Sequence, residues 1–414
     1  MRYIRIIILL ILCLNLLLFT SCKIDAVIPE PVGGNLENQE DIDQSINNSQ
    51  NSSTEPVGKP ATEDTISVYP QQWATGTGTA SNPWANDCIK KAYDACPVGG
   101  TVFLKAGYYQ LSGHVTLSKK VNIIGEGRNK TIVRTADTYG FLVIADYCTI
   151  KGMTIDGAAQ SPGKDYMCIE AHDCDYLVIE EIEGINSFTA IQPNRVNNSI
   201  FRNLYLHDNE HLGMHPINQV AGRGINNTFQ NIWAWNNGDR GIDAGAEVIS
   251  GITNNVYDNI HCWNNGGNGI NDDTWGHGLA ITYEKGIVIS NCELKENTGN
   301  GIYLRGIEDS TVSNCSITLN GKSGILLSAD VKNVNFTDVI VKNNGTGINI
   351  YNSSNLVFTS CQSYDDRETP LQEYGLELHD TNTGISILNC KLTPNASDDI
   401  YNPSGVVLTV IAKK

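Results

Sequence analysis

The sequence of 414 residues predicts an all-β solenoid, a stack of strand-built turns coiled around one axis. A turn rich in Asn and Gly runs into a short apolar strand, as NNGDRGIDAG from residue 236 and NNGGNGINDD from residue 264. Further copies begin at residues 297, 320 and 343, and a looser copy begins at Asn209. A phrase that returns at intervals of roughly 20 to 30 residues is typical of a solenoid.

A second marker supports the same repeat. An Asn, or a residue with similar turn preference, directly precedes an apolar residue that we expect to point inward, at Asn203, Asn231, Asn259, Asn291, Asn314, Asp338, Ser360 and Asn389. Asn tolerates the left-handed backbone conformation of a tight turn and can hydrogen-bond along a ladder. We place the repeat at residues 121–392, with three short strands per turn. The lack of a convincing amphipathic helix in these residues excludes leucine-rich and helical repeats.

The N-terminus is typical of a targeting segment. Arg2 and Arg5 precede an apolar run over residues 6–19, and Thr20-Ser21-Cys22 follows. The run is short for a transmembrane span. Residues 1–22 resemble a bacterial lipoprotein signal, which implies a lipid on Cys22 and a membrane-anchored protein of the cell envelope. An ordinary secretory signal, and hence a secreted protein, is the alternative.

The rest of the chain divides into a tether and one folded domain. Residues 23–66 are rich in Asn, Ser, Gln, Glu and Pro, and such a segment cannot bury enough apolar surface to fold. Residues 67–414 form the domain, with a cap at about residues 67–120. Within the cap, residues 84–95 have helical spacing, with Cys88, Ala92 and Ala95 on one face. A cap covers the strand edges and apolar core of the first turn.

Composition narrows the possible partners and metal sites. The net charge of −17 argues against nucleic acid, because phosphate binding needs a basic surface. The chain has no CxxC pair. Four cysteines recur at one point of the repeat and are expected to stack inside as small hydrophobic side chains: Cys292, Cys315, Cys361 and Cys390. For Cys88 and Cys96, simple burial is favoured over a disulfide.

The repeated phrases resemble the right-handed parallel β-helix family, the fold of pectate lyases, polygalacturonases, alginate epimerases and phage tailspikes. The NNGxxGI phrases and the later Asn-Cys phrases carry this resemblance, over residues 121–392. It implies a right-handed parallel β-helix solenoid with an N-terminal helical cap. Because this scaffold hosts many chemistries, function has to be inferred from particular side chains.

One file of side chains is the candidate for chemistry. If each phrase is one turn, the residue two places after its glycine lies on the outside, about 4.8 Å from its equivalent in the next turn. The file reads His215, Asp243, Asn271, Tyr303, Leu326, Asn349 and Glu377. Asp273 and Arg305 lie two residues further along their turns and are expected to point the same way, while Arg240 lies in the turn before Asp243.

The polar half of this file suits proton chemistry on a uronate sugar. Such chemistry needs a base for the C5 proton, and His215 is the candidate, with Asp243 beside it. It also needs a group that neutralises the sugar carboxylate, and Arg240 or Arg305 could hold it bidentately. These four residues are the predicted catalytic set.

Residues 272–285 lengthen their repeat and predict a loop over one face, where functional residues concentrate. The predicted substrate-binding residues in and near this loop are Asn271, Trp275, His277, Tyr303 and Lys285. Asp272 and Asp273 are candidate Ca²⁺ ligands, with capping of turn backbone groups as the alternative. Trp233, Trp235 and Trp263 on the preceding turns predict either sugar stacking or packing on each other.

The family's own catalytic phrases are matched in part. Polygalacturonases combine an aspartate pair, a Gly-His-Gly and an Arg-Ile-Lys; this chain has the pair, Gly276-His277-Gly278 and Arg305 in that order, without Arg-Ile-Lys. Alginate epimerases carry Asp-Pro-His, which Met214-His215-Pro216 resembles. Calcium-dependent pectate lyases have a lysine base in the file, where this chain has none.

We therefore expect an exported polysaccharide-active enzyme, a lyase or epimerase on a uronate polymer with possible use of Ca²⁺. The alternatives are a glycoside hydrolase of the polygalacturonase type and a non-catalytic surface protein that binds glycans.

Overall fold

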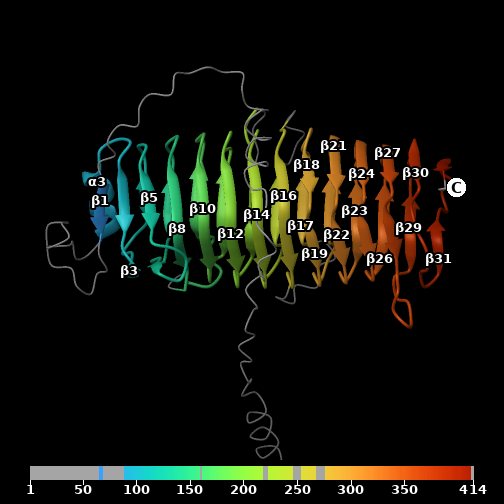
Figure 1. Cartoon of the computed structure of the whole chain (residues 1–414), viewed down its shortest axis with the longest axis horizontal. Helices are drawn as coiled ribbons and strands as arrows, with labels where there is room; N and C mark the ends of the chain where they lie inside the picture. Colours follow the sequence, from blue (N-terminus) through green and yellow to red (C-terminus); the bar gives the residue numbers. More distant parts are fainter. Residues whose placement is uncertain are drawn as a thin grey trace, which may run out of the picture. The chain divides into compact units, whose positions relative to one another are not determined.

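Parallel strands from successive turns stack side by side around a common axis (Figure 1), which confirms the predicted parallel β-helix. The computed structural model describes residues 65–68, 88–158, 161–217, 222–245, 253–266 and 276–411, all within one compact unit. Cys22, the signal segment and residues 23–64 of the tether lie outside the described residues. Among those described, no helix is long and apolar enough to cross a membrane.

One face of the coil is a 12-stranded sheet within the described residues. Its strands, in chain order and in spatial order alike, are β4 (Val115–Leu117), β7 (Phe141–Val143), β9 (Met167–His172), β11 (Thr189–Asn194), β13 (Leu212–Met214), β15 (Ile242–Gly245), β17 (Leu279–Thr282), β20 (Ile302–Arg305), β23 (Ser323–Ser328), β26 (Thr346–Tyr351), β29 (Tyr374–His379) and β31 (Asp398–Tyr401).

The rest of each turn belongs to a 20-stranded sheet, counted over the same described ranges. Its strands are β1 (Thr65–Val68), β2 (Thr101–Leu104), β3 (Gly107–Gln110), β5 (Asn122–Gly125), β6 (Thr131–Arg134), β8 (Thr149–Asp156), β10 (Val178–Ile185), β12 (Ile200–His207), β14 (Thr228–Trp235), β16 (Val256–Trp263), β18 (Val288–Ser290), β19 (Glu293–Lys295), β21 (Glu308–Ser313), β22 (Ser316–Thr318), β24 (Lys332–Thr337), β25 (Ile340–Lys342), β27 (Ser354–Thr359), β28 (Gln362–Tyr364), β30 (Ile385–Leu388) and β32 (Leu408–Ile411).

The second sequence marker lies where the strands of this sheet bend or break. Every marker residue has a positive φ, from Asn203 at 56° to Asn389 at 55°. Asn231 and Asn259 bend the eight-residue strands β14 and β16, whereas Asn291 separates β18 from β19. The left-handed conformation expected of these residues is therefore confirmed, and it sets the corner of each turn.

The N-terminal cap contains α3 (Cys88–Ala95), which packs against β1, β2 and β4. Its buried face consists of Cys88, Ile89, Ala92 and Tyr93. Ala95 is exposed, so its predicted place on that face was wrong; Tyr93, the larger side chain, fills the contact instead. Among the described cysteines no disulfide forms, and all are buried except the half-buried Cys390, which agrees with simple packing.

A ladder of buried amides explains the repeated Asn-Gly phrase. The side-chain amide of each Asn donates to the Oδ1 of the next, at 2.9 or 3.0 Å, through Asn209, Asn237, Asn265, Asn297, Asn320 and Asn344. A Cβ at Gly241 would lie 3.0 Å from the amide nitrogen of Asn265, and one at Gly301 would lie 2.8 Å from that of Asn320. The glycine that opens each strand is therefore required because the ladder occupies the space of its side chain.

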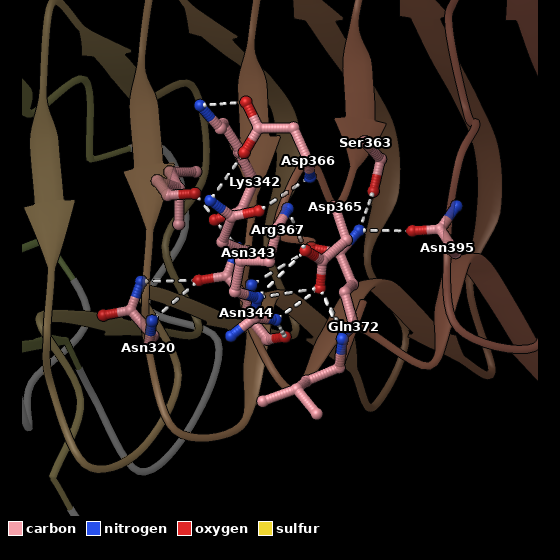
Figure 2. Close-up of polar contacts among 12 residues, drawn as sticks. Asn320, Lys342, Asn343, Asn344, Ser363, Asp365, Asp366, Arg367, Gln372 and Asn395 are labelled. Atoms are coloured by element: carbon pink, nitrogen blue, oxygen red, sulfur yellow. Dashed lines mark hydrogen bonds and ion pairs between the residues drawn. The ribbon is translucent and has the colours of Figure 1, made fainter. Parts of the chain in front are cut away.

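The ladder continues past Asn344 through a different residue type (Figure 2). The backbone N–H of Asn344 donates to Gln372 Oε1 at 3.2 Å, and Gln372 Nε2 donates to Asn395 Oδ1 at 2.8 Å. Asp365, fully buried, accepts bonds from the Arg367 guanidinium and from the N–H groups of Leu371 and Gln372, both at 2.7 Å. The Asp365 carboxylate thereby holds the segment between β28 and β29 in place, so that Gln372 reaches the ladder position.

Candidate active site

Four polar side chains lie in one file on the outer face of the 12-stranded sheet: Glu170, Gln192, His215 and Asp243, here called the polar row. Gln192 pairs in register with Glu170. Gln192, His215 and Asp243 each follow a buried residue. These buried residues pair with one another across β11, β13 and β15, Ile191 with Met214 and Met214 with Ile242. Strand alternation therefore directs the next residue of each strand outward, and neighbours are about 4.8 Å apart.

The structure brings together three of the four predicted catalytic residues. His215 Nε2 lies 3.9 Å from Asp243 Oδ2. The Arg240 guanidinium binds the same Asp243 oxygen through Nη1, and its Nε lies 3.8 Å from Asp239 Oδ1. Arg240 is thus a cation held between two carboxylates beside His215.

A second file runs along the turn at the edge of the polar row. The ring of Phe188 stacks on His211 with centroids 4.7 Å apart. His211 Nε2 lies 3.2 Å from Asp239 Oδ2, and the other oxygen of Asp239 accepts the N–H of Gly276 at 3.0 Å. His211 and Asp239 therefore flank the row with a second histidine–carboxylate pair.

The surroundings set the charge state of two of these groups. Burial lowers the pKa of His215, and the charge of Asp243 opposes that effect only in part. His215 is therefore neutral near neutral pH and can accept a proton. Burial alone would raise the pKa of Asp239, but the hydrogen bond with His211, the charge of Arg240 and the Gly276 N–H together hold it below its usual value. Asp239 is therefore an ionised partner for Arg240.

The other end of the polar row was missed by sequence reasoning. Glu170 is 5% exposed and binds His172 Nε2. Burial, the Glu170 charge and a hydrogen bond with Glu170 raise the pKa of Tyr139, whose ring lies edge-on to Tyr166 at 5.5 Å. The repeat phrase was not recognised here because Cys168 and Ala190 occupy the glycine position; the alternation of Ile191 and Pro193 with polar residues was the usable signal.

Beyond Asp243 the file differs from the prediction. Asp243 pairs with Ala280, which pairs with Tyr303, so Ala280 and not Asn271 holds the intervening position. The strand begins after Gly278, where a Cβ would lie 2.9 Å from the Asn297 amide of the ladder. The glycine next to the ladder, rather than the first matching phrase, therefore fixes the register. Tyr303 is in the file as predicted.

Arg305, the fourth predicted catalytic residue, is not brought to His215. It pairs with Thr282, which pairs with Gly245, and its guanidinium lies over the Tyr283 ring at 5.3 Å. This places it two turns from Asp243 and two residues further along the strand. Arg240 is therefore the arginine adjacent to the candidate base.

Two predicted substrate-binding residues have other partners. His277 is buried, accepts the Asn300 N–H at Nδ1 at 3.0 Å, and lies 5.1 Å from the Tyr303 ring. Lys285 binds Asp309 at 2.8 Å and Glu308 at 3.4 Å, beyond the end of β17. His277 thus borders the C-terminal side of the row, whereas Lys285 belongs to a separate surface network.

Asp272 and Asp273 lie outside the described residues, as do Asn271 and Trp275. Across the described ranges, no group of three or more His, Cys, Asp or Glu side chains is arranged to hold a metal ion.

The tryptophans of the preceding turns stack on each other. Trp235 and Trp263 have ring centroids 4.9 Å apart and an interplanar angle of 1°, and His207 stacks on Trp235 at 4.0 Å. Trp233 is stacked in the same way between Tyr205 and His261. Trp233 and Trp235 therefore have both ring faces covered by neighbouring rings and closed to a sugar, so packing is the alternative that the structure supports for these two.

Comparison with known proteins supports the fold. Residues 260–408 match the family model described as right handed beta helix region, and the chain is a right-handed parallel β-helix as predicted. A comparison with curated protein sequences gave no match. The chain is similar to the A-module of mannuronan C-5 epimerase AlgE6 from Azotobacter vinelandii, at 18% identity and a TM-score of 0.62, over 79% of this chain and 95% of that one.

Two other solved structures share the architecture. The A-module of mannuronan C-5 epimerase AlgE4 from the same organism has 18% identity and a TM-score of 0.58, over 83% of this chain and 98% of that one. A catalytic domain of GH87 alpha-1,3-glucanase, in complex with tetrasaccharides, has 12% identity and a TM-score of 0.56, over 86% of this chain and 70% of that one. At these identities the likeness concerns the fold.

Proposed function

We propose that the protein is an exported enzyme that removes the C5 proton of a uronate residue in a polysaccharide, as a lyase or an epimerase. The observation that carries this proposal is the half-buried, neutral His215 in the polar row, next to Asp243 and Arg240. The mannuronan C-5 epimerases of similar fold act, by their names, at the same carbon of a uronate polymer.

Each residue has a distinct role in this scheme. His215 Nε2 takes the C5 proton, and Asp243 stabilises the imidazolium that forms. Arg240 supplies positive charge for the sugar carboxylate as the negative charge of the carbanion delocalises into it. In a lyase, the electron pair then forms the C4–C5 double bond and the C4–O bond breaks, its oxygen taking a proton. In an epimerase, a proton returns to C5 from the opposite face.

The proposal includes Ca²⁺ as an accessory cation. Carboxylates of the type of Asp272 and Asp273 are the ligands that Ca²⁺ prefers, and the ion would help to neutralise the substrate carboxylate. Assays therefore run with Ca²⁺ and with a chelator.

The test is turnover of a panel of uronate polymers by the purified domain and by His215→Ala. Unsaturated products appear in ultraviolet absorbance, and epimerised products appear in the NMR spectrum of the polymer. We expect one of the two signals with the native protein and its loss with His215→Ala. A native protein that gives neither signal with any uronate polymer contradicts the proposal.

A hydrolase is the second candidate, because Asp239 and Asp243 both flank the site and the alpha-1,3-glucanase domain has a similar fold. A hydrolase needs one carboxyl that stays protonated as general acid. The lowered pKa of Asp239 disfavours it for that role. New reducing ends without unsaturation would identify hydrolysis, and binding without turnover would identify a glycan-binding protein.

The N-terminal segment supports a lipid anchor on Cys22, with the protein on a membrane of the cell envelope. Metabolic labelling with a radioactive fatty acid tests this: Cys22→Ser should lose the label and leave the membrane fraction, and a native protein without label contradicts the anchor.

A further inference from the structure

Two pairs of neighbouring cysteines lie in one inward-facing file of the 20-stranded sheet, here called the cysteine file. Each member directly follows one of the left-handed marker residues, and the residue after each member pairs in register with its counterpart in the next turn. The file reads Ile260, Cys292, Cys315, Val339, Cys361 and Cys390 in successive turns. Cys292 is therefore the neighbour of Cys315, and Cys361 is the neighbour of Cys390.

The backbone spacing of the Cys361–Cys390 pair suits a disulfide. Cys361 Sγ donates to the carbonyl oxygen of Phe336 at 3.5 Å, and Cys390 Sγ donates to that of Phe358 at 3.4 Å. Phe336 and Phe358 pair in register, so the two thiols point the same way from adjacent strands. Adjacent strands are about 4.8 Å apart, and a disulfide joins Cα atoms about 4.4 to 6.8 Å apart. Side-chain rotation would therefore bring the sulfurs together.

Access from solvent distinguishes the two pairs. Cys292 and Cys315 are each 2% exposed, whereas Cys390 is half-buried. The next strand, β32, covers the end of the coil incompletely: Val410 pairs with the buried Ile387 but is itself 58% exposed. The last thiol of the file is therefore within reach of a small molecule in solution.

The two thiols of the accessible pair have different acidities. A hydrogen bond from Cys361 lowers the pKa of Cys390, and the same bond raises the pKa of Cys361. The thiolate is the form of cysteine that attacks a disulfide. Cys390 can thus attack first, and Cys361 can attack second. Cys292 lowers the pKa of Cys315 in the same way, so the buried pair is a matched control that differs in access.

We propose that Cys361 and Cys390 form a disulfide when the folded protein meets a disulfide oxidant such as oxidised glutathione. The Cys390 thiolate attacks one sulfur of oxidised glutathione, forms a mixed disulfide and releases the first glutathione thiolate. Cys361 then loses its proton to that thiolate and attacks the Cys390 sulfur, which releases the second glutathione. The protein loses two hydrogen atoms and two electrons in all, and the oxidant becomes two molecules of glutathione.

The disulfide would cross-link the last turns of the coil. It encloses residues 362–389, which contain β28, β29, β30 and the segment held by Asp365. A cross-link of this kind stabilises a fold because it restricts the unfolded chain. Export, as proposed above, would bring the chain into a compartment where disulfide oxidants act. The inference goes beyond the proposed function and its test needs no turnover.

The experiment compares the two pairs in one sample. The folded protein with reduced thiols is incubated with oxidised glutathione, then unfolded in the presence of an alkylating reagent, digested and analysed by mass spectrometry. We expect a peptide pair joined through Cys361 and Cys390 that lacks two hydrogen atoms, and alkylated Cys292 and Cys315. The oxidised protein should unfold at a higher urea concentration than the reduced one, and Cys390→Ser should abolish both the link and this shift.

A second variant tests the order of attack. Cys361→Ser should accumulate the mixed disulfide with glutathione on Cys390, because the second thiol is missing. A Cys390 that stays unmodified in this variant contradicts its role as the attacking thiolate.

Three results with the native protein would overturn the inference. One is recovery of Cys361 and Cys390 as free thiols, or of Cys390 as a lasting mixed disulfide. Another is equal oxidation of the Cys292–Cys315 pair, because access would then have no influence. The third is an oxidised protein with the urea midpoint of the reduced one, which would contradict the stabilising cross-link.

Discussion

Glu284 inside the coil predicts a measurable dependence of stability on pH. It is 2% exposed, and its two oxygens accept bonds from Asn255 Nδ2 at 3.0 Å, Tyr257 Oη at 3.0 Å and Thr253 Oγ1 at 3.2 Å. Burial raises its pKa to about 7, against the three hydrogen bonds, which lower it. The perturbation is Glu284→Gln, which keeps the shape and removes the titration.

The magnitude follows from the difference between the folded and unfolded pKa. The unfolded carboxyl titrates near its model value of 4.5, while the folded one titrates at about 7. Between these values the unfolded chain has released its proton and the folded protein retains it. The stabilising contribution is therefore fully present below about pH 4.5 and is lost as the pH rises through 7. The total loss is on the order of 3 kcal/mol, at about 1.4 kcal/mol per pKa unit.

Urea unfolding followed by circular dichroism at pH 5 and pH 8 measures the effect. The native protein should lose about 2.5 kcal/mol more stability between the two pH values than Glu284→Gln loses, because other titrating groups contribute equally to both. Parallel pH dependence in the two proteins would refute the assignment of a raised pKa to this carboxyl.

Four further predictions concern separate features of the molecule. Asp243→Asn removes the charge that raises the pKa of His215, so the acidic limb of the pH–rate profile should move to lower pH; an unmoved limb would contradict this pairing. Asp365→Ala removes a buried acceptor and should cost about 3 kcal/mol in a thermal or urea unfolding experiment, whereas a loss near zero would mean that the inserted residues are held otherwise. Asn265→Ala interrupts the amide ladder and should cost about 2 kcal/mol by the same measurement, with unchanged stability as the contrary result. Trp235→Ala should lower stability by about 1 kcal/mol and leave kcat/KM for the polymer unchanged, and a large fall in kcat/KM would restore the sugar-stacking interpretation.

The fold could be predicted because the repeated residues are those that the backbone conformation and the close packing of each turn require. Asn203 and its equivalents adopt positive φ, and Gly241 leaves room for the Asn265 amide. These requirements act within one turn or between adjacent turns, so a single sequence shows them. On β11, Ala190 occupies the position of the glycine, so the Asn-Gly phrase was not recognised there although the repeat was placed over these residues.

Part of the candidate site could be predicted because its residues follow the repeat phrase, which is visible in a single sequence. Asp243 and Arg240 lie in a complete copy of the phrase and His215 lies in the looser copy before it, and the structure brings the three side chains together. Asn271 was misplaced because two glycines in one long repeat match the phrase, and only contact of Gly278 with the neighbouring turn decides between them. Glu170 was missed since its importance comes from register with a strand two turns away, which the local pattern does not contain.

The most direct measurement follows deuterium from solvent into C5 of a uronate polymer, because proton removal precedes both elimination and epimerisation. In D₂O the native protein should yield either unsaturated ends or deuterium at C5, and His215→Ala should yield neither while Asn349→Ala, in the same file of the sheet, behaves as the native protein does. Exchange that persists at the native rate in His215→Ala would contradict the role of this histidine as the base.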